Sequence, residues 1–245
     1  QIDISQYKSQ FANVPGDFFI TWGENMTFTV NYTISEDNGV SWNYLNNPDM
    51  VTCIVGSYNS KIMAKGVGNG IFTATFNSSV FSAGYGSELY WVEISGTKLG
   101  YIDPDPVYFS VTINALPTAL SIHDYETLTI HPNNLTYEYW NELFNLTVQY
   151  QETSGSMDIS DASLSYDWLY GSGTINPDPI NDGYYTFTIN TSVAPAGGQY
   201  QFEITATKEN YTQIQDFDFD IIIKPRPTRL NGSANIIYLS TDVLL

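Results

Sequence analysis

The chain carries one sequence pattern twice, in residues 16–115 and again in residues 134–225, and this duplication restricts the possible folds more than any motif does. The offset between matching residues falls from 118 to 113 and then to 110, and it changes only between strand-like segments. A unit of about 100 residues is long enough to bury its own core. The sequence therefore predicts a row of complete domains. The matching pairs include Trp22/Trp140, Glu24/Glu142, Tyr32/Tyr150, Phe72/Tyr185, Asn77/Asn190, Lys98/Lys208, Tyr101/Tyr211 and Pro117/Pro227.

Large side chains alternate with polar ones along most of the chain, and no stretch keeps a helical period. Phe72, Ala74 and Phe76 alternate with threonines, and residues 185–189 repeat this pattern in the second copy. Such alternation of aromatic and β-branched residues is typical of half-buried antiparallel strands. About seven short strands per copy, separated by Gly, Pro, Asn and Asp, predict an all-β chain of two tandem immunoglobulin-like antiparallel β-sandwiches.

Short joins that contain proline separate the copies. Proline restricts φ and removes a backbone donor, so strand pairing stops there and the join stays extended and stiff. We expect one sandwich in residues 1–116 and a second in residues 117–227. Residues 228–245 repeat the start of a copy, and they predict either the leading strand of a third repeat or a strand packed on a neighbouring subunit. We favour the third repeat, because residues 2–14 already supply a leading strand to the first copy.

Charge and composition exclude several classes of partner. Acidic residues number 26 against 8 Lys and Arg, which gives a net charge of −18. Such a field repels phosphate backbones and anionic lipid, so we expect no nucleic-acid partner. No apolar run of 18 residues exists, which predicts no membrane insertion by this segment. Cys53 is the single cysteine, so no intrachain disulfide can form. The expected partners are adjacent repeats, neighbouring copies of the chain and covalent glycans.

Asparagine usage indicates the compartment. The N-glycosylation pattern Asn-x-Ser/Thr occurs eight times, whereas chance would give about four for this composition. If Phe28 and Phe144 face the core, period-two alternation turns Asn25, Asn31 and Asn145 to solvent. We therefore predict an extracellular, glycosylated protein, although a polar β surface rich in Asn and Thr would give the same pattern. The predicted acceptors are Asn25, Asn31, Asn77, Asn134, Asn145, Asn190, Asn210 and Asn231.

Several segments of the second copy resemble a known family. They are Gly-Tyr-Tyr-Thr-Phe-Thr-Ile-Asn-Thr-Ser at 183–192, Ala-Gly-Gly-Gln-Tyr at 196–200, Thr-Ala-Thr-Lys-Glu-Asn-Tyr at 205–211 and Pro-x-Pro-Thr-x-Leu at 225–230. Together they resemble the tandem immunoglobulin-like repeats of very large archaeal cell-surface proteins, such as those of Asgard archaea. The resemblance implies an extracellular scaffold, adhesin, surface-layer or filament component that carries many glycans. It supplies no catalytic residues.

The first copy departs from this family pattern. Residues 57–70 have no close partner in the second copy, and Gly84-Tyr85-Gly86 replaces the usual Gly-x-Tyr start of the next strand. The resemblance therefore leaves the loops of the first copy unassigned.

The sequence offers no catalytic constellation. Glu24 and Glu142 each follow a tryptophan by two residues at the start of equivalent strands. One enzyme seldom repeats its acid or base in adjacent modules, so this duplication predicts a structural role such as accepting loop N–H groups. No nucleophile elbow or glycine-rich phosphate loop occurs. We expect no enzyme activity.

Metal ligands are sparse. On one extended strand His123 and His131 would lie about 26 Å apart, too far for one zinc ion. Calcium remains a candidate cofactor, because acidic loops could offer oxygen ligands, although Asp-Pro is also a plain turn signal. No other cofactor is expected. The candidate calcium ligands are Asp103, Asp105, Asp158, Asp161, Asp178 and Asp182.

Five tryptophans leave a second function open. Trp22 and Trp140 are equivalent, which favours a packing role, whereas the facing of Trp91 and Trp168 is ambiguous. We predict a non-catalytic structural module of a glycosylated cell-surface assembly, such as a surface layer, filament or stalk. The alternative is a carbohydrate-binding adhesin module that stacks sugars on an exposed indole.

Overall fold

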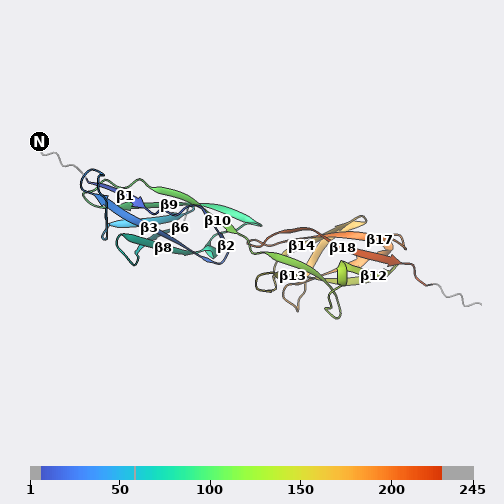
Figure 1. Cartoon of the computed structure of the whole chain (residues 1–245). Coiled ribbons are helices and arrows are strands. Elements are labelled where there is room, and N and C mark those ends of the chain that lie inside the picture. Colours follow the sequence, from blue (N-terminus) through green and yellow to red (C-terminus); the bar gives the residue numbers. More distant parts are fainter. Residues whose placement is uncertain (1–6, 58, 228–245) are drawn as a thin grey trace, which may run out of the picture.

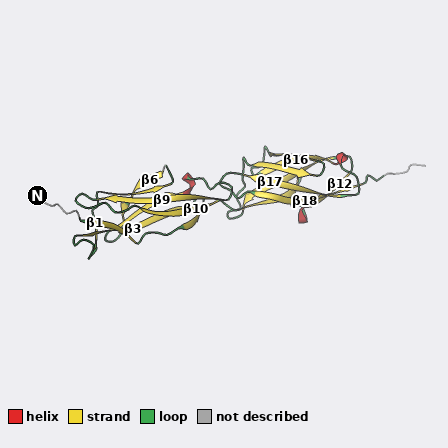
Figure 2. Cartoon of the chain, turned by 90° about the horizontal axis from the view of Figure 1, so that it is seen from above, coloured by secondary structure: helices red, strands yellow, loops and turns green. Residues whose placement is uncertain are grey.

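The computed structural model describes residues 7–57 and 59–227, and these residues form two β-sandwiches that lie end to end (Figures 1 and 2). The predicted strand in residues 228–245, the sequon at Asn231 and the first residues of the predicted leading strand lie outside the described residues. No described helix is long and apolar enough to cross a membrane.

The first sandwich consists of two sheets. One sheet has the strand order β1-β3-β8-β7, with β4 added to β3, and the other has the order β2-β10-β9-β5-β6. Its elements are β1 (Lys8–Ala12), β2 (Phe18–Thr21), β3 (Asn25–Ser35), β4 (Asn43–Tyr44), β5 (Met50–Val55), β6 (Asn59–Ile62), β7 (Ala64–Lys65), β8 (Ile71–Asn77), the 3-10 helix η1 (Ser78–Val80), β9 (Ser87–Thr97) and β10 (Val107–Asn114).

The second sandwich repeats this plan. Strands β11-β13-β16 form one layer and β14-β17-β18-β12 the other, while β15 pairs with both β14 and β16 and joins the layers into one sheet. Its elements are β11 (Thr118–Asp124), the 3-10 helix η2 (Pro132–Asn134), β12 (Leu135–Tyr139), β13 (Leu143–Glu152), β14 (Ser163–Trp168), β15 (Gly171–Pro177), β16 (Tyr184–Asn190), the 3-10 helix η3 (Thr191–Val193), β17 (Gln199–Thr207) and β18 (Ile214–Lys224).

The strand order identifies both sandwiches as immunoglobulin-like. The leading segment splits in each, so that its first part pairs antiparallel with one sheet (β1 with β3, β11 with β13). Its second part changes sheets and pairs parallel with the last strand (β2 with β10, β12 with β18). This split, together with the short strands β4, β6 and β7, gives the first sandwich more strands than the predicted seven.

Alternation explains how each core forms. In β3, every second side chain from Met26 to Tyr32 is at most 1% exposed, and the residues between them face outward. The strand β13 repeats this pattern, with Leu146, Val148 and Tyr150 buried. The buried apolar side chains form two separate clusters, one drawn from residues 26–115 and the other from residues 120–223.

Candidate functional site

The predicted glycan acceptors lie mainly on one sheet of each sandwich. Asn25 and Asn31 belong to β3 and Asn77 ends β8, while Asn145 belongs to β13 and Asn190 ends β16. Of these, all but Asn31 are exposed, and Asn31 is half-buried. The strands of the opposite sheets, β2-β10-β9-β5-β6 and β14-β17-β18-β12, contain no sequon asparagine, although the sequon at Asn134 begins in η2 and runs into β12. A sugar on any of the strand acceptors would therefore project from the same layer of its sandwich.

Two of these asparagines also shape the backbone. Asn77 and Asn190 precede the equivalent 3-10 helices η1 and η3, and each Oδ1 accepts the N–H of the serine two residues on, at 2.9 and 3.0 Å. Asn77 further donates its Nδ2 to Oδ1 of Asn25, its partner across β3 and β8, at 3.1 Å. The amide nitrogens of this pair are close neighbours, which crowds any modification of both.

Trp22 and Trp140 donate equivalent indole hydrogen bonds, as their duplication predicts, although Trp22 packs against the first core and Trp140 is 40% exposed. The indole of Trp22 donates to the Phe81 carbonyl at 2.9 Å, and that of Trp140 donates to the Ala194 carbonyl at 3.1 Å. Each acceptor directly follows its 3-10 helix and precedes a loop. Both tryptophans therefore tie the loop after η1 or η3 to the strand-like segment that precedes β3 or β13.

The loop at 82–85 forms the junction between the sandwiches. The backbone of Asn210 donates to the Gly84 carbonyl, and the Asn210 Oδ1 accepts the N–H of Ala83, both at 2.8 Å. The Gln213 N–H donates to the Tyr85 carbonyl at 2.9 Å, and the Ser82 hydroxyl donates to Glu209 at 3.0 Å. These four hydrogen bonds join the turn at 208–211 of the second sandwich, and Gln213 just after it, to the end of the first.

The join itself takes part in this junction. The N–H of Leu116 donates to the Asn210 carbonyl at 2.9 Å, and the Leu116 carbonyl accepts the Thr212 N–H at 2.8 Å. Asn210 has a φ of 71°, a left-handed conformation that asparagine and glycine tolerate best. Its equivalent in the first sandwich is Gly100, with a φ of 87°. The turn shape is thus shared by both sandwiches, whereas the side chain that reaches Ala83 belongs to the second alone.

The paired glutamates have structural contacts. Oε2 of Glu24 accepts the Thr21 N–H at 3.1 Å, as predicted for a loop acceptor. Glu142 differs, because its Oε1 contacts Nη2 of Arg226 at 3.2 Å. Each carboxylate thus has a local role, and the two equivalent positions have different partners.

The expected distance between the histidines is wrong. A turn at 125–128 reverses the chain, so that Ile130 pairs with His123 and the His131 N–H donates to the Ile122 carbonyl at 2.8 Å. The separation of about 26 Å assumed one continuous strand, whereas β11 ends at Asp124. Both ring nitrogens of His123 already lie in hydrogen bonds, to Ser121 and to the Leu128 carbonyl. Within residues 7–57 and 59–227, no group of three His, Cys, Asp or Glu side chains could hold a metal.

The candidate calcium ligands lie in separate loops with contacts of their own. Oδ1 of Asp178 accepts the N–H groups of Ile180 and Asn181, which makes it the acceptor of a tight turn. Oδ1 of Asp158 accepts from Gln149 at 2.7 Å. Asp161 has a left-handed φ of 54° and accepts Lys208 through its backbone carbonyl. The described residues therefore form no preformed cage for the predicted calcium ion, and Asp182 does not belong to any group of three potential ligands.

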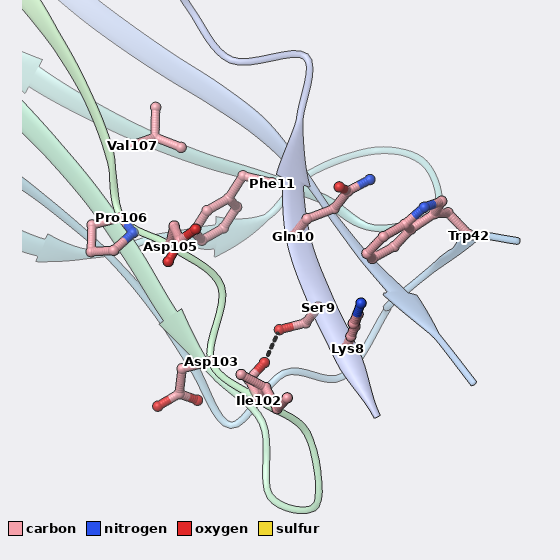
Figure 3. A pocket seen from close by; sticks show the side chains of 10 residues that line it. All are labelled: Lys8, Ser9, Gln10, Phe11, Trp42, Ile102, Asp103, Asp105, Pro106 and Val107. Carbon is pink, nitrogen blue, oxygen red and sulfur yellow. Dashed lines mark hydrogen bonds between the residues drawn. The ribbon is translucent and has the colours of Figure 1, made fainter. Parts of the chain in front are cut away.

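Asp103 and Asp105 line a cavity of about 450 Å³ at the outer end of the first sandwich (Figure 3). Trp42 and Lys8 stand on the opposite side of this cavity from the two aspartates. The Ser9 hydroxyl donates to the Ile102 carbonyl at 2.5 Å and holds β1 to the loop before β10. The cavity combines an indole, one cation and two carboxylates, and sequence reasoning had assigned only its aspartates.

The structure also settles which way the other tryptophans face. Trp168 stacks on Phe202 with ring centroids 4.4 Å apart and packs on the second core. Trp91 is 64% exposed on the outer face of β9, beside Tyr108 of β10 at 62%. Their equivalents in the second sandwich are Gln201 and Asp218, which contact each other at 2.5 Å. Only the first sandwich therefore presents aromatic side chains at these positions.

Comparison with known proteins finds only distant structural similarity. The sequence matches no protein-family model and no curated protein. Among solved structures, the chain is similar to the fibronectin(III)-like modules of CbhA from Clostridium thermocellum, at 12% identity and a TM-score of 0.30, covering 89% of this chain and 94% of that one. Titin domains Z1Z2 in complex with telethonin give 8% identity and 0.38, covering 91% and 99%. The Yersinia pseudotuberculosis adhesin InvE gives 13% and 0.37, covering 89% and 58%.

Proposed function

We propose that this chain is a non-catalytic, extracellular structural module of a glycosylated cell-surface assembly. The observation that carries the proposal is the placement of the sequons: five lie on β3, β8, β13 and β16, and four of those asparagines are exposed. A polar β surface would place sequon asparagines on either sheet, whereas here the strands of the opposite sheets contain none and Asn134 lies in η2, just before β12. N-glycans need such accessible amides on secreted proteins.

The proposal includes a stiff spacer. The two sandwiches are held end to end by hydrogen bonds on both sides of the three-residue join between β10 and β11. Pro117 restricts the backbone of the join, and hydrogen bonds hold Leu116 to the turn that contacts it. Both features oppose bending at the junction. A net charge of −18 keeps such spacers apart in water and favours partners that are neutral or basic.

The finer parts of the proposal come from the sequence. The resemblance of residues 183–230 to repeats of archaeal cell-surface proteins supports an archaeal surface layer, filament or stalk. Adjacent repeats and neighbouring copies are the proposed partners. The sheets whose strands contain no sequon asparagine offer these partners a surface that sugars on the strands of the other layer would leave uncovered.

Glycopeptide mass spectrometry of protein from a host that performs N-glycosylation tests this function. We expect sugar on most of Asn25, Asn77, Asn145 and Asn190, which are exposed. Asn43 of β4 is exposed, lies outside any sequon and serves as the unmodified control. Unmodified asparagines at all four exposed sequons in the native material would refute the proposal.

A carbohydrate-binding adhesin module is the second candidate, and the exposed Trp91 favours it. Indole and phenol rings that are exposed on a sheet provide flat apolar platforms for sugar rings. Trp91 and Tyr108 are exposed and lie on the adjacent strands β9 and β10. A glycan array read with the wild type and with Trp91→Ala would test it. Binding that survives this change, or no binding by the wild type, would remove the second candidate.

A further inference from the structure

The second sandwich ends in a loop built like the one that forms the junction. Residues 82–85 and 195–198 both follow a 3-10 helix that an asparagine caps. A tyrosine hydroxyl holds each loop: Tyr90 donates to the Ser82 carbonyl at 2.8 Å, and Tyr200 donates to the Pro195 carbonyl at 2.7 Å. The equivalent indoles of Trp22 and Trp140 anchor the residue before each loop. The two loops are therefore held in place by the same contacts.

Within the part of the chain that the structure describes, only the first of these loops is covered. Ala83 is 0% exposed, because the turn that carries Asn210 lies against it, whereas its equivalent Ala196 is exposed. Gly84 and Gly197 have left-handed φ values of 59° and 87°, so the two loops turn in the same sense. Within the described residues, the Ala196 N–H and the Gly197 carbonyl have no hydrogen-bond partner. In the junction, the equivalent N–H and carbonyl bind the side chain and the backbone of Asn210.

The segment that leaves the second sandwich adds a further pair of groups. Arg226 is equivalent to Leu116, whose N–H and carbonyl pair with the turn at 210–212. The guanidinium of Arg226 donates to the carbonyls of Trp140 and Asn141, both at 3.0 Å. These contacts hold the segment against the end of the sandwich. The backbone N–H and carbonyl of Arg226 have no partner in the described part of the chain.

We propose that the loop at 195–198 and the backbone of Arg226 form a docking site for the asparagine-containing turn of a third repeat of the same type. The occupant would bind as the turn at 208–211 binds the first sandwich. Asparagine at its third position would accept the Ala196 N–H and donate its own N–H to the Gly197 carbonyl. One contact would differ, because the Gly198 carbonyl already accepts the Ile223 N–H at 2.9 Å, whereas the equivalent Tyr85 carbonyl accepts Gln213.

Two observations select this occupant over the first sandwich of a second copy. The equivalent turn in the first sandwich has Gly100 in place of asparagine and cannot supply the side-chain acceptor. The pairing of Leu116 with residues 210–212 also requires the join to run directly into the docked domain. Pro227 and Thr228 repeat Pro117 and Thr118, which begin the docked domain at the first junction. The occupant therefore belongs to the same polypeptide. This inference depends on the end-to-end arrangement and not on glycosylation.

Amide hydrogen exchange tests the docking site, using unglycosylated protein so that the result is independent of the proposed function. In the 245-residue chain, we expect the Ala83 amide to exchange at least about tenfold more slowly than that of Ala196. A longer chain, in which a second copy of residues 118–227 follows Pro227, should slow exchange at Ala196 by a similar factor.

Variants of the added copy provide the controls. Replacing the asparagine equivalent to Asn210 by glycine should return Ala196 to fast exchange, since glycine keeps the left-handed turn but lacks the acceptor. Replacing it by aspartate should keep Ala196 slow. The Ala83 amide serves as the internal reference in every chain. Fast exchange at Ala196 in the longer chain would overturn the proposal. Protection that rises with the concentration of the 245-residue chain would also overturn it, in favour of a second molecule.

Discussion

Asn210→Gly is the change that isolates one contact of the observed junction. Residue 210 has a φ of 71°, which glycine adopts without strain, so the turn and its backbone hydrogen bonds should persist. The change removes only the side-chain oxygen that accepts the Ala83 N–H at 2.8 Å. Ala83 is 0% exposed, so this N–H would be left in a site closed to water.

The cost follows from that burial. A buried donor left without a partner destabilises by about 1–3 kcal/mol, which corresponds to a factor of about 5 to 150 in an equilibrium. This cost falls on the junction and not on either core, because Asn210 belongs to neither buried cluster. The contacts of Gly84, Tyr85 and Ser82 remain, so the junction should loosen while both sandwiches stay folded.

Residual dipolar couplings measured for each sandwich would report this loosening. The wild type should align as one body, whereas Asn210→Gly should give the two sandwiches different degrees of order and should speed exchange at the Ala83 amide. Asn210→Asp keeps an acceptor oxygen and removes the sequon, and Thr212→Val removes the sequon without changing residue 210. Both controls should behave as the wild type. Two results would contradict this role of Asn210. One is unchanged alignment and unchanged Ala83 exchange in Asn210→Gly, and the other is an equal disruption of the junction by Asn210→Asp.

Four further predictions concern stability and reactivity. Burial raises the pKa of Glu138, so the stability that its protonated form contributes is lost as the pH rises through that pKa. Glu138→Gln should therefore raise Tm at pH 7, and the difference from the wild type should shrink in acid. A difference in Tm that stays constant with pH would contradict this assignment. Burial also raises the pKa of the Cys53 thiol to about 12, so a thiol reagent at pH 8 should label the unfolded chain and leave the folded one unlabelled. Chelator treatment should leave Tm unchanged, and a fall that calcium reverses would show that the separated aspartates do assemble a site. Trp22→Phe and Trp140→Phe should each destabilise their own sandwich by about 1–3 kcal/mol in denaturant unfolding, and clearly unequal losses would show that the two indoles are not equivalent.

The features predicted from sequence are those that depend on local alternation and on duplication. Inward rows such as Met26 to Tyr32 follow from period two alone, because a strand must place every second side chain on one face. The common role of Trp22 and Trp140 follows from their equivalence. Both features are properties of a short segment, and the structure confirms them.

The histidines show where local reasoning failed. The turn after Asp124 places Leu128 in a left-handed conformation with a φ of 51°, which is uncommon for leucine and leaves no sequence signal. The better signal was Asp124 itself, whose Oδ1 accepts the N–H groups of Glu126 and Thr127. An aspartate followed by a threonine three residues later is consistent with such a turn.

The junction could be predicted only in part. Asn210 aligns with Gly100, and these two residue types share a preference for left-handed backbone, so the turn was detectable from the repeat. Its sequon instead directed attention to a glycan. The contact with Ala83 depends on how two domains sit against each other, and no pattern within one segment encodes that arrangement.

In each sandwich, the second part of the leading segment switches sheets and pairs parallel with the last strand. This pairing determines how each sandwich would respond to tension. β2 pairs with β10 over Val111 to Asn114, and β12 pairs with β18 over Asp220 to Lys224. Pulling the two ends of the chain apart draws these partners along their own axes in opposite directions. The hydrogen bonds of each ladder are then loaded together and not one after another, as they would be in an unzipping hairpin. A spacer made of such units resists stretching through cooperative shear.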